Sequence, residues 1–365
     1  MKTRQKLRLL MLAYIGIGIL GTSALAQTWQ SAGPVPRYGH SAVLDTTTNR
    51  MLIFGGQITT SNASSNTDLN EVWRLNSNLT WTAVKPKGTP PAPRLYHSAV
   101  FDASSNRMIV FGGGEGFTSP CANDVWVLTN ANGIGGMPTW TSLSPTGTAP
   151  APRAQHGAVY DPSTNTMIVY GGQNCFSTIF GDVWVLSNAN GLGGTSTWTQ
   201  LSPTGGGPSS REITGGVAYD STNNRLIVFG GSPEHNDVWV LSNANGQGGT
   251  PTWTQLSPSG TLPAARQANS TVYDPTSNRL TIFGGADQSN HLFNDVWVLT
   301  NANGLGGTPA WTQLGPFASF PEARYVHTGV YNSSTNKMTV FGGLTTYSSS
   351  LTTNDVSVLN HANGQ

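Results

Sequence analysis

Hydrophobic and polar positions alternate in short blocks along most of the chain. Between positions 94 and 143, four blocks rich in β-branched and aromatic residues are separated by segments rich in Asn, Ser, Gly and Pro. The blocks cover residues 97–102, 107–113, 124–128 and 139–143. Blocks of this length between turn-forming residues predict four consecutive β-strands, called a, b, c and d in chain order.

The four-block unit recurs six times along the chain. In every copy the second block ends in a Gly-Gly pair, at Gly55-Gly56, Gly112-Gly113, Gly171-Gly172, Gly230-Gly231, Gly284-Gly285 and Gly342-Gly343. Successive pairs are 57, 59, 59, 54 and 58 residues apart. A four-stranded unit repeated at this spacing predicts an all-β protein with six propeller blades.

The repeat also carries a family resemblance. Its features are Pro-Arg before strand a, Gly-Gly after strand b, Asn-Asp-Val-Trp in strand c and Trp-Thr in strand d. This pattern resembles a kelch repeat from about Thr28 to the C-terminus. The resemblance implies a six-bladed kelch-type β-propeller, but kelch propellers include enzymes, ligand receptors and scaffolds, so it implies no single function.

The first 26 residues are predicted to be a signal peptide. Basic residues precede an apolar run over 9–20, and Ala24-Leu25-Ala26 fits a small-x-small cleavage site. We therefore expect an exported protein, periplasmic or extracellular, whose residues 27–365 form a single propeller domain. An uncleaved membrane anchor is the alternative, although the apolar run is short for a spanning helix.

Removal of this segment leaves 14 basic and 17 acidic residues. Charged residues make up 10% of the chain, against about 25% in typical domains. Because no basic stripe remains, nucleic acid is not an expected partner. After signal cleavage no segment is predicted to span a membrane, and we expect a monomer.

The position of the strand d tryptophans predicts how the ring closes. Five copies have this tryptophan downstream of strand c, at Trp81, Trp140, Trp198, Trp253 and Trp311. The sixth copy ends without a strand d, whereas Thr28-Trp29-Gln30 precedes the first repeat. We predict that this N-terminal segment is strand d of the last blade, which would leave no open edge in the ring.

The two faces of the predicted ring differ in sequence. Loops a–b and c–d share one face, where the c–d loops are nearly identical, as in NANGLGG, and indicate a structural turn. Loops b–c and d–a share the other face, where the b–c loops differ in length and content. Variable loops on a rigid scaffold usually carry function, so the second face is the predicted ligand face.

An arginine opens strand a of every copy on that face: Arg37, Arg94, Arg153, Arg211, Arg266 and Arg324. One interpretation pairs each with the acid that opens strand c: Glu71, Asp124, Asp182, Asp237, Asp295 and Asp355. The other makes the arginines donors to a carboxylate or to sugar hydroxyl groups. The resemblance allows both, since arginines at this position take part in kelch proteins that bind acidic ligands.

Histidines and tyrosines follow several of these arginines. His40, His97, His156 and His327 occupy one strand position, where a buried hydrogen-bonding role is the main interpretation, and we predict no metal site. Tyr38, Tyr96 and Tyr325 lie in blades 1, 2 and 6, respectively, which are neighbours in the ring. The predicted ligand-binding residues are Arg37, Tyr38, Arg94, Tyr96, Arg153, Arg324 and Tyr325, although the tyrosines could instead only cover their own blades.

Cys121 and Cys175 fall in b–c loops of neighbouring blades on the same face. In an exported chain, this placement predicts a disulfide between blades 2 and 3. A redox or copper cysteine is the alternative, but the sequence has no Cys-x-x-Cys motif.

Few acidic residues remain once the repeat positions are set aside. Glu212, Glu234 and His235 are weak candidates for general acid or base catalysis, and the main interpretation is that they are solvated surface groups. We predict a non-catalytic binding module for a carbohydrate or protein, without a cofactor. The alternative is a carbohydrate-active enzyme, similar to the kelch sialic-acid mutarotases or, less closely, to the propeller of galactose oxidase.

Overall fold

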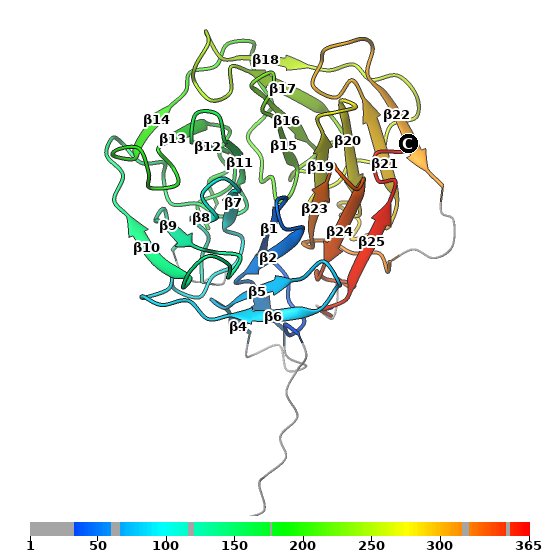
Figure 1. Ribbon diagram of the computed structural model, residues 1–365. Coiled ribbons are helices and arrows are strands. Elements are labelled where there is room, and N and C mark those ends of the chain that lie inside the picture. The colour runs from blue at the N-terminus through cyan, green and yellow to red at the C-terminus, as the bar shows by residue number, and fades with distance from the viewer. Residues whose placement is uncertain (1–32, 60–65, 116–119, 176, 316–320, 348–350) are drawn as a thin grey trace, which may run out of the picture. The chain divides into compact units, whose positions relative to one another are not determined.

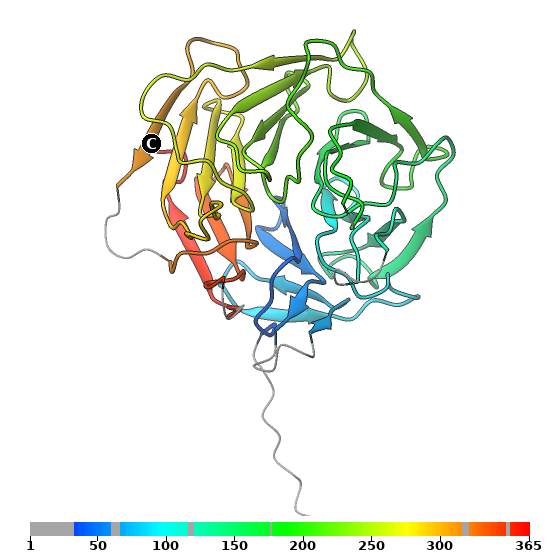
Figure 2. The same ribbon diagram turned by 180° about the vertical axis from the view of Figure 1, so that it is seen from behind.

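Six antiparallel sheets surround a central axis in the described residues (Figures 1 and 2). The structure is a computed structural model that describes residues 33–59, 66–115, 120–175, 177–315, 321–347 and 351–365. Five sheets have four strands, and the sixth has three within these residues. The predicted all-β, six-bladed propeller is confirmed.

The strands form concentric shells. The innermost are β1 (Ser41–Asp45), β7 (Ser98–Asp102), β11 (Gly157–Asp161), β15 (Val217–Asp220), β19 (Ser270–Asp274) and β23 (Thr328–Asn332). The second are β2 (Arg50–Phe54), β8 (Arg107–Phe111), β12 (Thr166–Tyr170), β16 (Arg225–Phe229), β20 (Arg279–Phe283) and β24 (Lys337–Phe341). The third are β5 (Val72–Leu75), β9 (Val125–Thr129), β13 (Val183–Ser187), β17 (Val238–Ser242), β21 (Val296–Thr300) and β25 (Val356–Asn360).

The outer shell contains β6 (Trp81–Val84), β10 (Thr139–Leu143), β14 (Thr197–Gln200), β18 (Thr252–Gln255) and β22 (Ala310–Leu314). A short hairpin of β3 (Gln57–Ile58) and β4 (Thr67–Asp68) extends the b–c loop of blade 1. Consecutive innermost strands contact one another around the ring, including β23 and β1. The first and last blades are therefore neighbours.

Strand burial follows the position of each shell. The innermost strand β1 alternates between buried and half-buried residues, because one of its faces borders the axis. The second strand of a blade is enclosed on both faces, so β12 is buried at every residue and reads as a continuous apolar run.

Aromatic rings join each blade to the next at the contact that we call a seam. The outer-strand tryptophan of one blade packs on the last aromatic residue of the second strand in the preceding blade. The centroid distances are 5.1 Å for Trp140–Phe54, 5.0 Å for Trp198–Phe111, 5.4 Å for Trp253–Tyr170, 5.3 Å for Trp311–Phe229 and 4.8 Å for Trp81–Phe341. Such pairs add about 0.5–1.5 kcal/mol beyond the buried area.

Phe283 of blade 5 is the sixth residue of this kind, and no tryptophan of the described residues packs on it. It lines a groove of about 950 Å³ that runs beside β25 and also contains Val296, Leu314 and Met338. The predicted closing strand, residues 28–30, and the predicted signal peptide lie outside the described residues, so both stay predictions.

On the face of the a–b and c–d loops, polar side chains join the blades. The Asn that precedes Gly in each NANG loop, and in the His-Ala-Asn-Gly segment of blade 6, donates to the Asp that ends the innermost strand of the preceding blade. These bonds are all 2.7 Å long: Asn132–Asp45, Asn190–Asp102, Asn245–Asp161, Asn303–Asp220 and Asn363–Asp274. The prediction that the repeated c–d loops are structural turns is confirmed. At the seam between blades 6 and 1, Asn332 instead donates to Asn49 at 2.7 Å.

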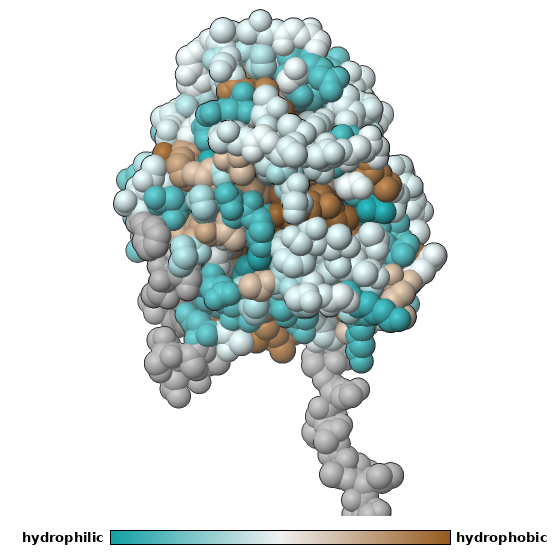
Figure 3. Space-filling view, turned by 90° about the vertical axis from the view of Figure 1, so that its left-hand side faces the viewer, coloured by the Kyte–Doolittle hydropathy of each residue, from teal (hydrophilic) through white to brown (hydrophobic). Residues whose placement is uncertain are grey.

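The side of the ring that carries β10 and β14 is mostly hydrophilic or neutral, with hydrophobic residues in separate patches (Figure 3). Separate patches of this kind are normal on soluble domains. No helix among the described residues is long and apolar enough to cross a membrane.

Candidate functional site

The six strand-entry arginines are enclosed by protein and lie between 0 and 3% exposed. Each forms an ion pair with the acid that opens strand c of its own blade, as the first interpretation predicted. The distances are 2.7 Å for Arg94–Asp124, 2.7 Å for Arg153–Asp182, 2.6 Å for Arg211–Asp237, 2.6 Å for Arg266–Asp295 and 2.7 Å for Arg324–Asp355, and Arg37 pairs with Glu71.

These guanidinium groups also bind backbone. Arg94 Nη1, for example, donates to the Gly112 carbonyl at 2.8 Å, and Nε donates to the Ala92 carbonyl at 3.1 Å. Burial alone would raise the pKa of Asp124, but hydrogen bonds from Arg94 and from the Trp126 indole outweigh burial and lower it. The arginines therefore tie the b–c and d–a segments of a blade together, and their role as ligand donors stays a prediction.

The four predicted histidines connect neighbouring blades. Each Nε2 bonds to a hydroxyl of the preceding innermost strand: His40 to Thr328 and His97 to Ser41 at 2.8 Å, His156 to Ser98 at 2.8 Å, and His327 to Ser270 at 2.9 Å. Burial, reinforced by the nearby arginines, lowers the histidine pKa values, to about 3 for His156 and His327. The interpretation as buried hydrogen-bonding residues is confirmed.

The described residues contain no group of three or more His, Cys, Asp or Glu side chains placed to hold a metal ion.

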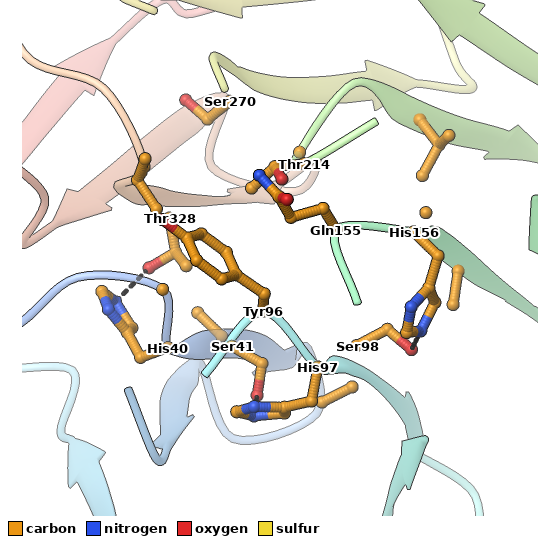
Figure 4. A pocket seen from close by; sticks show the side chains of 18 of the residues that line it. His40, Ser41, Tyr96, His97, Ser98, Gln155, His156, Thr214, Ser270 and Thr328 are labelled. Carbon is orange, nitrogen blue, oxygen red and sulfur yellow. Dashed lines mark hydrogen bonds between the residues drawn. The ribbon is translucent and has the colours of Figure 1, made fainter. Parts of the chain in front are cut away.

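A polar cavity of about 170 Å³ lies on the axis among these pairs (Figure 4). Figure 4 shows the His40–Thr328, His97–Ser41 and His156–Ser98 bonds around it, with the Tyr96 ring lying between them. The Thr214 hydroxyl, at the position that histidine takes in four other blades, is buried and has no hydrogen-bond partner among the described residues.

Tyr96 is held in this place by its backbone. Its φ of 56° is in the left-handed region, where a bulky residue is strained. Its N–H donates to the Gly39 carbonyl at 2.7 Å, and its carbonyl accepts from Gln155 N–H at 2.9 Å. The start of strand a in three blades is thereby linked around the axis.

The three predicted tyrosines and Tyr347 form two pairs on the b–c face. Tyr38 is buried, donates its hydroxyl to Gln57 and contacts Tyr96 edge-on at 6.2 Å. Tyr325 stacks on Tyr347, with ring centroids 4.6 Å apart and planes at 6°. Tyr347 is 36% exposed, so the second pair offers an aromatic surface to solvent.

Two of the three weak catalytic candidates lie within electrostatic range of each other. Burial first, and then the charge of Glu234, raise the pKa of Glu212, while a hydrogen bond with Gln155 opposes the shift. Glu234 accepts from Gln267 Nε2 at 2.7 Å. His235 instead bonds Ser209 Oγ through Nε2 at 3.3 Å, and burial lowers its pKa.

The predicted disulfide is confirmed: Cys121 and Cys175 are bonded, with their Cα atoms 5.5 Å apart. It links the b–c loops of blades 2 and 3 at the edge of the candidate surface.

The predicted ligand-binding residues do not include three residues of this surface: Gln155, Gln267 and Tyr347. A signal for the first two was present: Gln267 follows an entry arginine by one position, as Tyr38 and Glu212 do, and Gln155 follows one by two positions, as Tyr96 does. Comparing these two positions across all six copies would have found a mixed ring of polar and aromatic residues. Tyr347 lies in a b–c loop without a repeat equivalent, so no such comparison could place it.

Comparison with known proteins agrees with this architecture. The chain matches the KLHDC2/KLHL20/DRC7 Kelch-repeats domain family over residues 22–231 and 216–365. The protein therefore belongs to the kelch-repeat family. It also resembles the solved structure titled "Structure of YjhT", with a TM-score of 0.60 over 90% of this chain and 99% of that one, at 16% identity. That likeness concerns the fold alone.

Three curated relatives share parts of the chain. Dynein regulatory complex subunit 7 of Chlamydomonas reinhardtii is 33% identical over 37% of this chain and 11% of its own length. The leucine-zipper-like transcriptional regulator 1 homolog of Drosophila melanogaster is 27% identical over 79% and 29%. The human Rab9 effector protein with kelch motifs is 31% identical over 38% and 35%. The chain thus matches about a third or less of each relative's length.

Proposed function

We propose that this protein is a binding module that takes a protein ligand on the face of its b–c and d–a loops, around the axis. The observation that carries the proposal is the mixed ring at the strand entries, where the half-buried Gln155, Glu212, Gln267 and Tyr325 interrupt an otherwise repeated framework. Positions that the blade contacts do not require are free to recognise a partner.

Family membership supports the same proposal. Kelch propellers commonly act as protein-interaction modules, and one relative is named an effector of Rab9. The buried ion pairs and the disulfide hold the surface rigidly, which lowers the entropic cost of binding. We also propose that the protein works outside the cytoplasm, where a disulfide such as Cys121–Cys175 persists.

The test is a selection of twelve-residue peptides from a random phage-displayed library on the purified protein. Peptides that bind should lose at least tenfold in affinity in a Tyr325→Ala/Tyr347→Ala variant. A matched variant on the opposite face, Ile134→Ala/Leu305→Ala, removes two exposed side chains of the c–d loops and should bind normally. Absence of binders, or loss only in the matched variant, would reject this face.

A carbohydrate-active enzyme is the second candidate, favoured by the half-buried Glu212 beside Glu234. A glycan array followed by product analysis separates the two functions. Turnover of a bound sugar that disappears in Glu212→Gln would establish the enzyme in place of the binding module.

A further inference from the structure

The unpaired charges that a ligand would meet near the axis on the b–c face are negative. The positive charges at the strand entries are buried and already paired, as Arg211 is with Asp237. By contrast, no Arg, Lys or His nitrogen of the described residues lies within 4.0 Å of Glu212 or Glu234. A ligand that approaches the axis therefore meets carboxylates before guanidinium groups.

These two carboxylates are held in position by neutral neighbours. Glu234 Oε1 accepts from Gln267 at 2.7 Å, and Glu212 is hydrogen-bonded with Gln155, which in turn accepts from Gln173. The amides orient the carboxylates without neutralising them. Because both are half-buried, each loses part of its hydration, and a cation brought between them would recover that loss.

An aromatic wall borders the same place. Tyr325 and Tyr347 are stacked, and the exposed ring of Tyr347 lies within electrostatic range of Glu234, Asp287 and Glu212. Burial first, and then these charges, raise the pKa of the Tyr347 hydroxyl, so the ring stays neutral. A neutral tyrosine face beside carboxylates attracts ammonium and guanidinium groups through both cation–π and ionic contacts.

A third carboxylate, that of Asp287, is already hydrogen-bonded and is not expected to bind the cation itself. Its Oδ1 accepts from the backbone N–H groups of Ser289 at 2.9 Å and His291 at 3.0 Å, which fixes it within its own loop. It adds negative charge at the border of the site without needing a ligand of its own.

We propose that the protein ligand presents a lysine or arginine side chain, which is received between the carboxylates of Glu212 and Glu234 and the Tyr325–Tyr347 stack. This inference rests on the proposed function and adds the chemistry of the contact residue. It reverses the expectation that entry arginines select an acidic ligand.

The experiment uses the full protein and the peptides selected on it. At least one Lys or Arg should recur among the selected sequences, and its replacement by Gln in a synthetic peptide should weaken binding at least tenfold. Glu212→Gln and Glu234→Gln should cause a similar loss, because these variants remove charge and keep shape. Glu322→Gln, which changes an exposed glutamate of a d–a segment, is the matched control and should change affinity less than twofold.

A variant with reversed charge distinguishes a loss of recognition from a loss of folding, because a misfolded variant would bind no peptide. Glu234→Lys should lose the original peptides and bind those in which the basic residue is replaced by Glu. Selected peptides without a basic residue, or unchanged affinity in both Glu→Gln variants, would overturn the inference; loss in Tyr325→Ala/Tyr347→Ala would still uphold the proposed face. If no peptide binds at all, the proposed function fails and the inference fails with it.

Discussion

Four seams of the ring share two contacts, and each of the two seams beside blade 6 has only one of them within the described residues. From blade 1 to blade 5, every seam has a tryptophan on an aromatic ring and an Asn-to-Asp bond, as in Trp198–Phe111 and Asn190–Asp102. The seam between blades 5 and 6 has the Asn–Asp bond, and no tryptophan of the described residues packs on its Phe283. The seam between blades 6 and 1 has the tryptophan and lacks the Asp.

The difference shows what a repeat needs. Each contact joins side chains from two consecutive copies, so it is complete only where both copies are complete. Blade 6 ends at strand c in the described residues, and blade 1 has the short c–d turn Asn76–Thr80 in place of a NANG loop. The ends of the chain are therefore where the seams depart from the pattern.

The largest effect is expected from removal of the segment that would complete blade 6. Deletion of residues 27–33 should lower the melting temperature by several degrees or more, because the groove beside β25 would stay unfilled. The chain just after the predicted strand is placed as it is before blade 4, since Gly33 and Gly207 each lie four residues before an entry arginine and against an outer-strand tryptophan. A Cβ on Gly33 would lie 2.8 Å from Trp81 Cδ1, just as one on Gly207 would lie 2.7 Å from Trp253 Cδ1.

The control for this deletion is a chain that lacks only residues 1–26, which should melt like the processed protein. If the shorter chain melts within about a degree of that control in calorimetry, residues 28–30 are not the closing strand.

A second test compares the aromatic contacts of two seams. Phe111→Ala should cost about 3–5 kcal/mol in urea unfolding, because Phe111 is fully buried against Trp198. If Trp29 packs on Phe283 in the same way, Phe283→Ala should cost a similar amount. The double variant Trp29→Ala/Phe283→Ala should then show a coupling of about 0.5–1.5 kcal/mol. Additive costs would remove Trp29 from the groove.

Much of this framework could be predicted from the sequence because it repeats. The partner of Arg94 follows from seeing an acid at the position of Asp124 in every copy. The histidine contacts were predicted in part: burial and hydrogen bonding were expected, but the partner was not recognised as the hydroxyl that follows the histidine of the preceding blade, as Ser98 follows His97.

The surface around Glu212 could not be predicted in this way. It brings together side chains from blades 3, 4, 5 and 6 through loops of different length, and its place is fixed by tertiary contacts such as Gln267 with Glu234. The left-handed backbone of Tyr96, which places its ring in the axis, recurs at the same repeat position in Gly39, Gln155, Ala268 and Val326, and among these only the glycine signals it in the sequence.

A smaller difference is expected between the polar contacts of two seams. Asn190→Ala removes a donor from the buried, charged Asp102 and should cost about 1.5–3 kcal/mol. Asn332→Ala removes a bond between two neutral amides. Each variant also loses two bonds to the amide oxygen, from Asn165 and Leu192 N–H at Asn190 and from Ser334 N–H and Oγ at Asn332, so Asn332→Ala should cost about 1 kcal/mol less than Asn190→Ala. Urea unfolding measures both, and a larger cost for Asn332→Ala would contradict the comparison.

The smallest effect is expected when the pH is lowered. Lower pH should destabilise the seams that contain a buried histidine more than the seam that has Asn269 in its place. The pKa of His156 is about 3 in the folded protein and about 6.5 in an unfolded chain. The stability that comes from its neutral form is therefore fully present above about pH 6.5 and is lost as the pH falls toward 3, by about 1.4 kcal/mol per pH unit. His156→Asn, which copies Asn269 of blade 5, should lose about 1 kcal/mol less of its unfolding free energy than the parent between pH 7 and 5.5.

Unfolding free energies at the two pH values measure this difference. The aspartates do not interfere, because their lowered carboxyl pKa values change the stability only below about pH 5. Equal losses in parent and variant would mean that His156 is protonated in the folded ring.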